Sequence, residues 1–424
     1  MKKEVVLLIF VIFILSVGCY HDKSKNPDKE TKSPFITDWC DDDPKSNVDF
    51  ISYSSGSFTL HYLPGTAAER DREDILNKRN SVLATIENML DIKEDRIIDI
   101  YMTPNRRAAK LHNVGAGAAS PVQGRIEVLY LDDPQSYEQT RYGHEVTHVV
   151  AYNIDPYNRF HLNFIEEGLA EFFDHSGRDY HQVFVQVCKA FKLDLAAAIQ
   201  LNKDDVYGRS YTKAASFIQT LFDIDPDADK FKAFFSGCYI YLKGNYPYSP
   251  DGQLIDADKL IEIIDSQLKV HYGITFEEFN KQWLDNLTPL VNTKPLRLAE
   301  DDLNEIKQLF TVRDQAMSEG NAELYRSTME GFYCDTLSDS ERMSIAEQTI
   351  SKAAAGKSRV IDAFYLTIKN YAWALVYFEK TVNGKTEILK AFLEHYPLGW
   401  RFNRVEDELG RGYSSGFGST LPEC

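Results

Sequence analysis

The chain has 424 residues and carries 47 Lys and Arg against 64 Asp and Glu, which gives a formal net charge of −17. At about 100–200 residues per domain, this length predicts two or three domains, and the shares of hydrophobic residues (43%) and charged residues (26%) exclude a wholly disordered chain. The acidic balance argues against a nucleic-acid partner, because phosphate binding needs a basic face. Six cysteines are too few for a disulfide scaffold.

The N-terminus begins with a short basic stretch, Lys2 and Lys3, followed by fourteen uncharged residues, Val5 to Gly18. This run is shorter than the roughly 20 apolar residues of a membrane-spanning helix, and it is typical of an export signal. It ends in Leu15 to Cys19 (LSVGC), which resembles the cleavage box of bacterial lipoproteins. The resemblance implies that Cys19 carries lipid and becomes the mature N-terminus. A signal that is cut elsewhere, or kept as an anchor, is the alternative.

We therefore predict a lipoprotein signal peptide over residues 1–19 and a flexible polar tether over 20–48, where no apolar period occurs. The protein is expected to be exported and lipid-anchored to the bacterial cell envelope, at the outer membrane or the cell surface. Its only membrane contact would be the lipid on Cys19.

From residue 49 the sequence becomes globular and predicts an α+β domain that ends near residue 290, before a plausible boundary at 290–302. Alternating or apolar runs predict strands, and apolar residues at helical spacing predict helices. The predicted strands before residue 136 are 57–62, 97–102 and 125–130, and the predicted helices are 68–90 and 106–111. Helices follow up to about residue 288.

The segment that carries the chemistry is His144-Glu145-Val146-Thr147-His148. In a helix, positions i and i+4 share one face, so both imidazoles can bind one zinc ion. Glu145 would then lie beside the metal as a base for its bound water.

A second helix is predicted to begin at Asn163, which would cap it together with Glu166 in a capping box. Glu166 is therefore interpreted as a capping residue rather than a metal ligand. His161 and His175 are interpreted as surface or second-layer histidines.

Glu167 follows His148 after eighteen intervening residues, within a Glu-Gly-Leu-Ala segment. This arrangement resembles the gluzincin metallopeptidases, whose pattern is His-Glu-x-x-His, about eighteen or more residues, and then Glu. The resemblance implies a thermolysin-like zincin fold and one zinc ion held by His144, His148 and Glu167. It also implies that Glu145 is the catalytic base and that Glu171 orients the first histidine.

Two related patterns are absent from the sequence. Metzincins place Gly three residues and His six residues after the second His, where this chain has Ala151 and Ile154. The Gly-x-Met-Glu-Asn signature of the clan's aminopeptidases is also missing, which disfavours exopeptidase action anchored on the substrate amine.

Tyr211 opens a further predicted helix, in a Tyr-x-x-Ala-x-x-Phe segment that ends at Phe217. This segment, and Gly273 to Trp283 after it, resemble parts of the peptidase MA-like family. The resemblance implies that the Tyr211 hydroxyl approaches the oxyanion of the reaction intermediate; a tyrosine that only packs at a helix start is the alternative. In gluzincins the substrate lies along a sheet edge at the strand before the zinc helix, which here is the predicted strand 125–130; the small residues from Gly115 to Ser120 lead into it and would let another backbone come close.

Residues 303–410 resemble the nuclear-transport-factor-like (SnoaL-like) cone, with leading helices followed by a curved antiparallel sheet. Four strand-like stretches run from Val360 to Val405, and Asn383-Gly384 predicts a hairpin between two of them. We find no acid/base cluster in this part and expect an accessory or binding role. Residues 411–424 form a Gly- and Ser-rich tail.

Export permits disulfides, and two pairs respect the proposed domains. These are Cys188 with Cys238 and Cys334 with Cys424, which leaves Cys40 unpaired.

The sequence therefore predicts a zinc-dependent peptidase that cleaves a peptide or protein substrate through a metal-activated water, with Glu145 as general base. The alternative is a non-catalytic surface lipoprotein that binds a partner or small ligand through its C-terminal domain. Metal-dependent hydrolysis of a non-peptide amide is a third possibility. Oligomeric state is not readable from the sequence.

Overall fold

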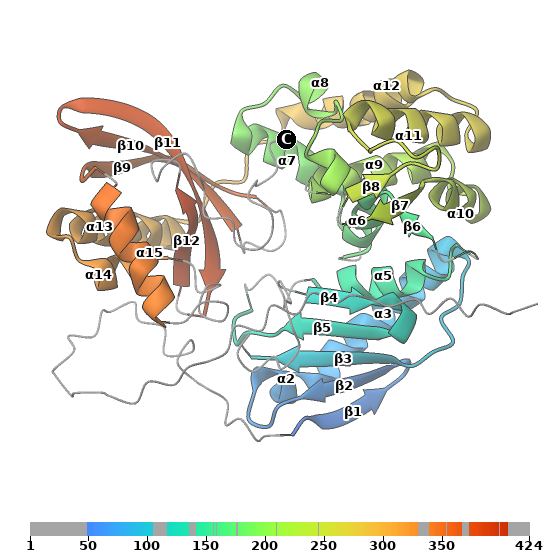
Figure 1. Ribbon diagram of the computed structural model, residues 1–424, viewed down its shortest axis with the longest axis horizontal. Helices are drawn as coiled ribbons and strands as arrows, with labels where there is room; N and C mark the ends of the chain where they lie inside the picture. Colours follow the sequence, from blue (N-terminus) through green and yellow to red (C-terminus); the bar gives the residue numbers. More distant parts are fainter. Residues whose placement is uncertain are drawn as a thin grey trace, which may run out of the picture.

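The computed structural model describes most of the chain between residues 49 and 405 (Figure 1). The described residues are 49–104, 117–134, 141–155, 157, 159–174, 177–208, 210–244, 246–329, 339–352, 354–366, 373–397 and 399–405. The predicted signal, tether, tail and 106–111 helix lie outside these ranges. Within the ranges, no helix is both long enough and apolar enough to cross a membrane.

The first part of the structure is a mixed five-stranded sheet in the order β1-β2-β3-β5-β4. Its strands are β1 (Ile51–Ser55), β2 (Phe58–Tyr62), β3 (Ile98–Thr103), β4 (Gly117–Ser120) and β5 (Arg125–Leu129). The inner three strands are parallel, whereas β1 and β4 pair antiparallel at the two edges. Burial alternates along β2, which gives the sheet one core-facing side.

The predicted helix over 68–90 is interrupted at Asp71, giving α2 (Ala67–Arg70) and α3 (Arg72–Leu90). The apolar residues of α3 lie on one side and are buried in the large core that also includes the sheet. A single apolar stripe is what fixes a surface helix against a sheet.

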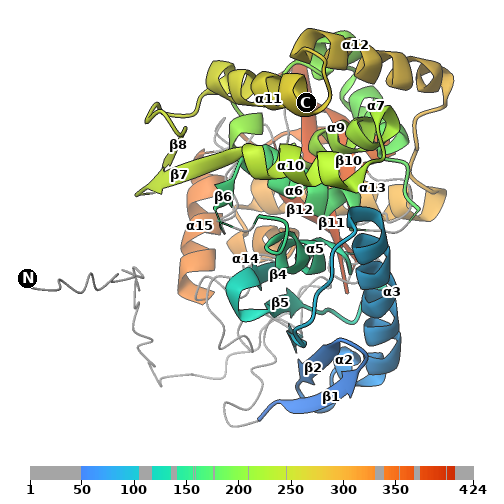
Figure 2. The same cartoon turned by 90° about the vertical axis from the view of Figure 1, so that its right-hand side faces the viewer.

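A mainly helical part follows the sheet, as Figure 2 shows with α3 running along one side. Its helices are α5 (His144–Ala151), α6 (Asn163–Phe172), α7 (Tyr180–Phe191), α8 (Leu195–Ala198), α9 (Tyr211–Ile224), α10 (Ala228–Gly237), α11 (Ala257–His271) and α12 (Phe276–Leu287). A small antiparallel sheet contains β6 (Phe160–His161), β7 (Tyr239–Lys243) and β8 (Tyr246–Tyr248). Among the described residues, short 3-10 helices occur at Pro121–Gln123, between β4 and β5, and at Asp205–Tyr207 and Thr288–Asn292 in the helical part. One hydrophobic core is continuous through the five-stranded sheet and these helices.

The C-terminal part has its own core and a four-stranded antiparallel sheet in the order β12-β11-β10-β9. Its elements are α13 (Glu300–Glu319), α14 (Ala322–Arg326), α15 (Asp339–Lys352), β9 (Lys357–Tyr365), β10 (Trp373–Val382), β11 (Lys385–Tyr396) and β12 (Gly399–Val405). The predicted hairpin at Asn383-Gly384 is confirmed: both residues have positive φ angles, 49° and 76°, as a tight two-residue turn requires. The chain is thus an α+β protein, as predicted.

The C-terminal sheet touches the preceding part at two separate places. The Tyr377 hydroxyl donates to the carbonyl of Ala190 at 2.9 Å, and the Lys192 ammonium lies 4.2 Å from the centre of the Tyr377 ring. Elsewhere, His395 Nδ1 lies 2.9 Å from an oxygen of Asp133. The sheet therefore contacts both the end of α7 and the segment that follows β5.

The predicted disulfide between Cys188 and Cys238 is wrong. Both residues are buried thiols in the large hydrophobic core, and burial raises the pKa of the Cys238 thiol. A buried cysteine of this kind packs as a small apolar side chain. Cys40, Cys334 and Cys424 lie outside the described residues.

Candidate metal centre

The two histidines come from α5, which is short and begins at His144 itself. Its N-cap is Gly143, which makes no side-chain cap. A Cβ on Gly143 would lie 2.0 Å from the carbonyl oxygen of Phe173, and the Gly143 N–H bonds to the carbonyl of Asp174 at 3.1 Å. Glycine is therefore needed for α5 to begin against the end of α6.

The glutamate comes from α6, which packs closely on α9. A Cβ on Gly168 would lie 2.8 Å from the carbonyl oxygen of Ala214, so the two helix backbones almost touch beside Glu167. The predicted cap is wrong, because Leu162 is the N-cap and Asn163 is already helical without a side-chain cap bond. Glu167, the predicted metal ligand, still lies on the side of α6 that faces the two histidines.

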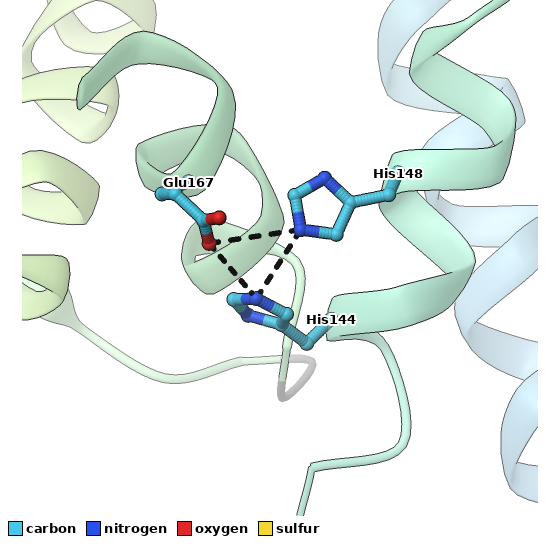
Figure 3. Close-up of side chains that lie close together, drawn as sticks. All are labelled: His144, His148 and Glu167. Carbon is cyan, nitrogen blue, oxygen red and sulfur yellow. Dashed lines mark hydrogen bonds and ion pairs between the residues drawn. The ribbon is translucent and has the colours of Figure 1, made fainter. Parts of the chain in front are cut away.

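The ligand atoms of His144, His148 and Glu167 converge (Figure 3). The Nε2 atoms of the two histidines are 3.3 Å apart, and Glu167 Oε2 lies 3.2 Å from that of His144 and 3.6 Å from that of His148. Ligands about 2.0–2.1 Å from a tetrahedral zinc ion lie roughly 3.3–3.4 Å from one another. The three donors are therefore spaced as zinc requires.

Charge is concentrated in this group. Burial lowers the pKa of an imidazole, but Glu167 together with Glu166 raises the pKa of His148 well above its ordinary value. For His144, burial and Arg141 lower the pKa, while Glu167 and Glu171 outweigh them and raise it. Burial also opposes the charge on Glu167, yet the two histidines hold its pKa well below the usual range.

Zinc binding is expected to weaken as the pH falls. The raised pKa values of His144 and His148 belong to the metal-free protein, so protons and zinc compete for the same ring nitrogens. Below those pKa values, each displaced proton lowers the affinity about tenfold per pH unit. Chelator competition between about pH 8 and about pH 6 measures this loss; an affinity that stays constant over that interval contradicts the assignment.

Each of the two histidines has a carboxylate near the ring nitrogen that points away from the group. Glu171 Oε2 lies 3.6 Å from Nδ1 of His144, and its orienting role stays a prediction. Glu166 Oε1 lies 3.6 Å from Nδ1 of His148, so Glu166 is a partner of the second histidine rather than a cap. Such partners fix the ring orientation and the tautomer of metal-binding histidines.

Sequence reasoning missed Arg141, whose buried side chain contacts His144, Glu171 and Asp174. Burial raises the pKa of Asp174, whereas burial opposed by Arg141 and His144 leaves the pKa of Glu171 lowered. Arg141 precedes the first residue of α5, so helical spacing gave no signal for it.

Glu145 follows the first ligand on α5 and lies beside the edge strand β4. A Cβ on Gly117 would lie 2.6 Å from Glu145 Oε1. The small residues of this segment thus allow the strand backbone to pass close to the predicted base. Because β4 is last in the sheet order, an extended chain can pair along its outer edge.

Tyr211 is the first residue of α9, and its ring centre lies 5.9 Å from that of His144. Burial, with Glu167 second, raises the pKa of its phenol, so the hydroxyl keeps its proton and can donate it in a hydrogen bond. Its catalytic role stays a prediction. His161 is buried against Phe235, and its Nε2 lies 3.3 Å from Asp155, apart from the ligand group; His175 lies outside the described residues.

A serine–histidine–aspartate arrangement also occurs but does not form a nucleophilic site. Ser216 Oγ lies 2.8 Å from His181 Nδ1, and His181 Nε2 lies 2.9 Å from Asp223. The Trp283 indole donates to Ser216 Oγ at 2.8 Å, and Ser216 is fully buried. This arrangement therefore ties α7, α9 and α12 together.

A second group of possible ligands contains Asp302, Glu305 and His395. Trp400 Nε1 donates to Asp302 at 3.0 Å and the Trp400 backbone N–H donates to Glu305 at 2.7 Å, while Asp133 pairs with His395. These bonds attach α13 to β12 and account for the cluster without a metal.

His144, His148 and Glu167 thus form a group that fits the His-Glu-x-x-His…Glu pattern of a zinc site. Neither a protein-family model nor a curated protein matches the chain. Among solved structures, the IMPa metallopeptidase from Pseudomonas aeruginosa is similar at 10% identity with a TM-score of 0.22. The match covers 74% of this chain and 36% of that chain, so this chain spans little more than a third of the IMPa length. A likeness this weak carries no argument, and the interpretation rests on the site geometry.

Proposed function

We propose that the protein is a zinc-dependent peptidase of the gluzincin type. The observation that carries the proposal is the convergence of His144 Nε2, His148 Nε2 and Glu167 Oε2 at distances of 3.2–3.6 Å. The donor set, two imidazoles and one carboxylate, matches catalytic zinc sites with three protein ligands. Glu145 completes the set as a base on the same helix.

The proposed reaction follows from these residues. His144, His148 and Glu167 would hold the zinc ion, which would supply a water molecule with a pKa lowered towards about 7. Glu145 accepts the proton of the attacking water and returns it to the leaving amine. The substrate backbone pairs with β4, which passes Glu145 at Gly117 and so brings a peptide bond within reach of the base.

Replacing Tyr211 with phenylalanine is expected to lower kcat by about 10²-fold, the lower end for loss of one oxyanion donor. KM should change little, because the charge that the hydroxyl stabilises develops only in the transition state. Steady-state kinetics measure both values. An unchanged kcat with a lowered melting temperature would support the alternative, a tyrosine that only packs at the start of α9.

A peptide-library digest distinguishes the peptidase from the two alternatives. A peptidase cuts members of the library at peptide bonds, and the cleavage positions show whether it acts within chains or from an end. A non-catalytic lipoprotein leaves the library intact although it binds zinc. Hydrolysis of a non-peptide amide alone would redirect the proposal to that class of substrate.

We also propose that the enzyme acts outside the cytoplasm, held by a lipid on Cys19. The support is the sequence of residues 1–19, which ends in the lipoprotein-like LSVGC segment. Mass analysis of the mature N-terminus tests this: a diacylated cysteine at position 19 is expected, and an unmodified or differently cut N-terminus contradicts it.

A further inference from the structure

Arg141 lies behind the candidate metal ligands, where the segment before α5 meets the end of α6 and the start of α9. Its side chain is 12% exposed, and one guanidinium nitrogen, Nη2, contacts both Glu171 Oε2, at 2.5 Å, and Nδ1 of His144. Its Nε lies 3.2 Å from Asp174. The arginine thus joins the segment before α5 to two carboxylates at the end of α6.

The two ring nitrogens of His144 need different partners. Its Nε2 faces Glu167 and His148, which is the side where the metal would bind. A neutral imidazole that gives its Nε2 lone pair to a metal keeps its proton on Nδ1 and must donate it. The Nδ1 atom therefore needs an acceptor.

A guanidinium group has only donors and cannot fill that need. Glu171 Oε2, 3.6 Å from Nδ1, is the carboxylate oxygen that lies against this atom and could accept its proton in a hydrogen bond. This is the same oxygen that Arg141 contacts at 2.5 Å. Arg141 and His144 therefore lie against the same carboxylate oxygen, and Arg141 makes the closer contact with it.

Arg141 also provides a positive charge beside two buried carboxylates. Glu171 and Asp174 are both buried, at 6% and 1% exposure, and two carboxylates in one buried site repel each other. Arg141 contacts both of them. Without it, the Glu171 side chain would lose the contact that opposes this repulsion and holds the carboxylate against His144.

We infer that Arg141 is a positioning residue of the metal centre: it holds Glu171 against the Nδ1–H of His144 and thereby sets the affinity for zinc. The inference rests on the proposed zinc centre and not on peptide hydrolysis. Replacing a partner of this kind typically lowers metal affinity by about 10–100-fold. Arg141 touches no reacting atom, and the effect of its replacement is therefore measured in zinc binding.

The test measures zinc affinity by chelator competition for wild type, Arg141→Met, Glu171→Gln and the double variant. Each single change is expected to weaken binding by about 10–100-fold, and the double variant should be little worse than either, because both changes act on the same contact between Glu171 and His144. The visible spectrum of the Co²⁺-substituted protein should change in the same variants.

Arg313→Met is the control, since Arg313 is fully buried on α13 in the separate C-terminal core. It reports the cost of removing a buried arginine and should leave zinc affinity unchanged. If Arg141→Met does not fold, Arg141→Lys carries the test, with an intermediate loss expected because lysine keeps the charge without the planar fork. Wild-type zinc affinity in the Arg141 variants, or fully additive losses, would overturn this inference alone. A wild-type protein that binds no zinc would overturn the zinc centre as well.

Discussion

Replacing Glu145 with glutamine is expected to lower kcat by about 10²–10⁴-fold, the usual contribution of a general base. Glutamine has nearly the same shape but cannot accept the proton of the attacking water. The ligand set of His144, His148 and Glu167 is untouched, so the variant should still hold about one zinc per chain. Cleavage of an unstructured protein, measured together with metal content, checks both parts.

Glu127→Gln provides a matched control for this experiment. Glu127 is a half-buried glutamate on β5 that pairs with Arg125 at 2.8 Å, and its replacement should leave turnover unchanged. Cleavage at the wild-type rate by the Glu145 variant would be incompatible with the proposed mechanism. Loss of zinc together with loss of cleavage would instead give Glu145 a structural role in the site.

Replacing Glu167 with glutamine is expected to remove zinc at ordinary metal concentrations. The change deletes the only anionic donor among the three converging atoms, so the loss should exceed the roughly 100-fold upper range for residues that merely support a ligand. Hydrolysis should fall in proportion to the zinc lost. Metal analysis after dialysis, followed by chelator competition, measures the effect.

Glu166, which precedes Glu167 in the chain, provides the control for this experiment. Glu166 lies 3.6 Å from Nδ1 of His148, on the side of the ring away from the ligand group, so Glu166→Gln should cost no more than about 10–100-fold. A Glu167 variant that keeps the wild-type zinc affinity, or a Glu166 variant that loses more, would mean that the ligand has been assigned to the wrong carboxylate.

The histidines of the site could be predicted because their relation is local. A four-residue spacing determines the shared face of a helix wherever that helix lies, so His144 and His148 needed no knowledge of the fold. Glu167 is distant in sequence and came from the resemblance to a known pattern. The grouping of these three residues is confirmed by the structure.

Arg141 and the true partner of Glu166 could not be predicted, because each depends on how α5 meets α6. That meeting is set by a close approach at Gly143, where a single Cβ would collide with the carbonyl of Phe173. Sequence periodicity predicts individual helices and strands, and it does not predict how closely two of them approach each other. The same limit explains the wrong disulfide, since two cysteines in one core need not face each other.

Strands were predictable where burial alternates, as in β2, but β4 was not predicted from its composition alone. Gly117 to Ser120 are small residues with low strand propensity, and the backbone pairing with β5 makes them a strand. Tertiary pairing therefore outweighed local preference at the position beside the predicted base.

The two contacts between the C-terminal sheet and the preceding part restrict how the histidines and the glutamate can move apart. His395 touches Asp133, ahead of the histidine helix, and Tyr377 touches Ala190, beyond the glutamate helix. A motion that separated the two imidazoles from the carboxylate would have to break one of these contacts or bend the sheet between them. The sheet therefore links the two parts that carry the histidines and the glutamate, so the rigidity of the candidate metal site depends in part on residues more than two hundred positions further along the chain.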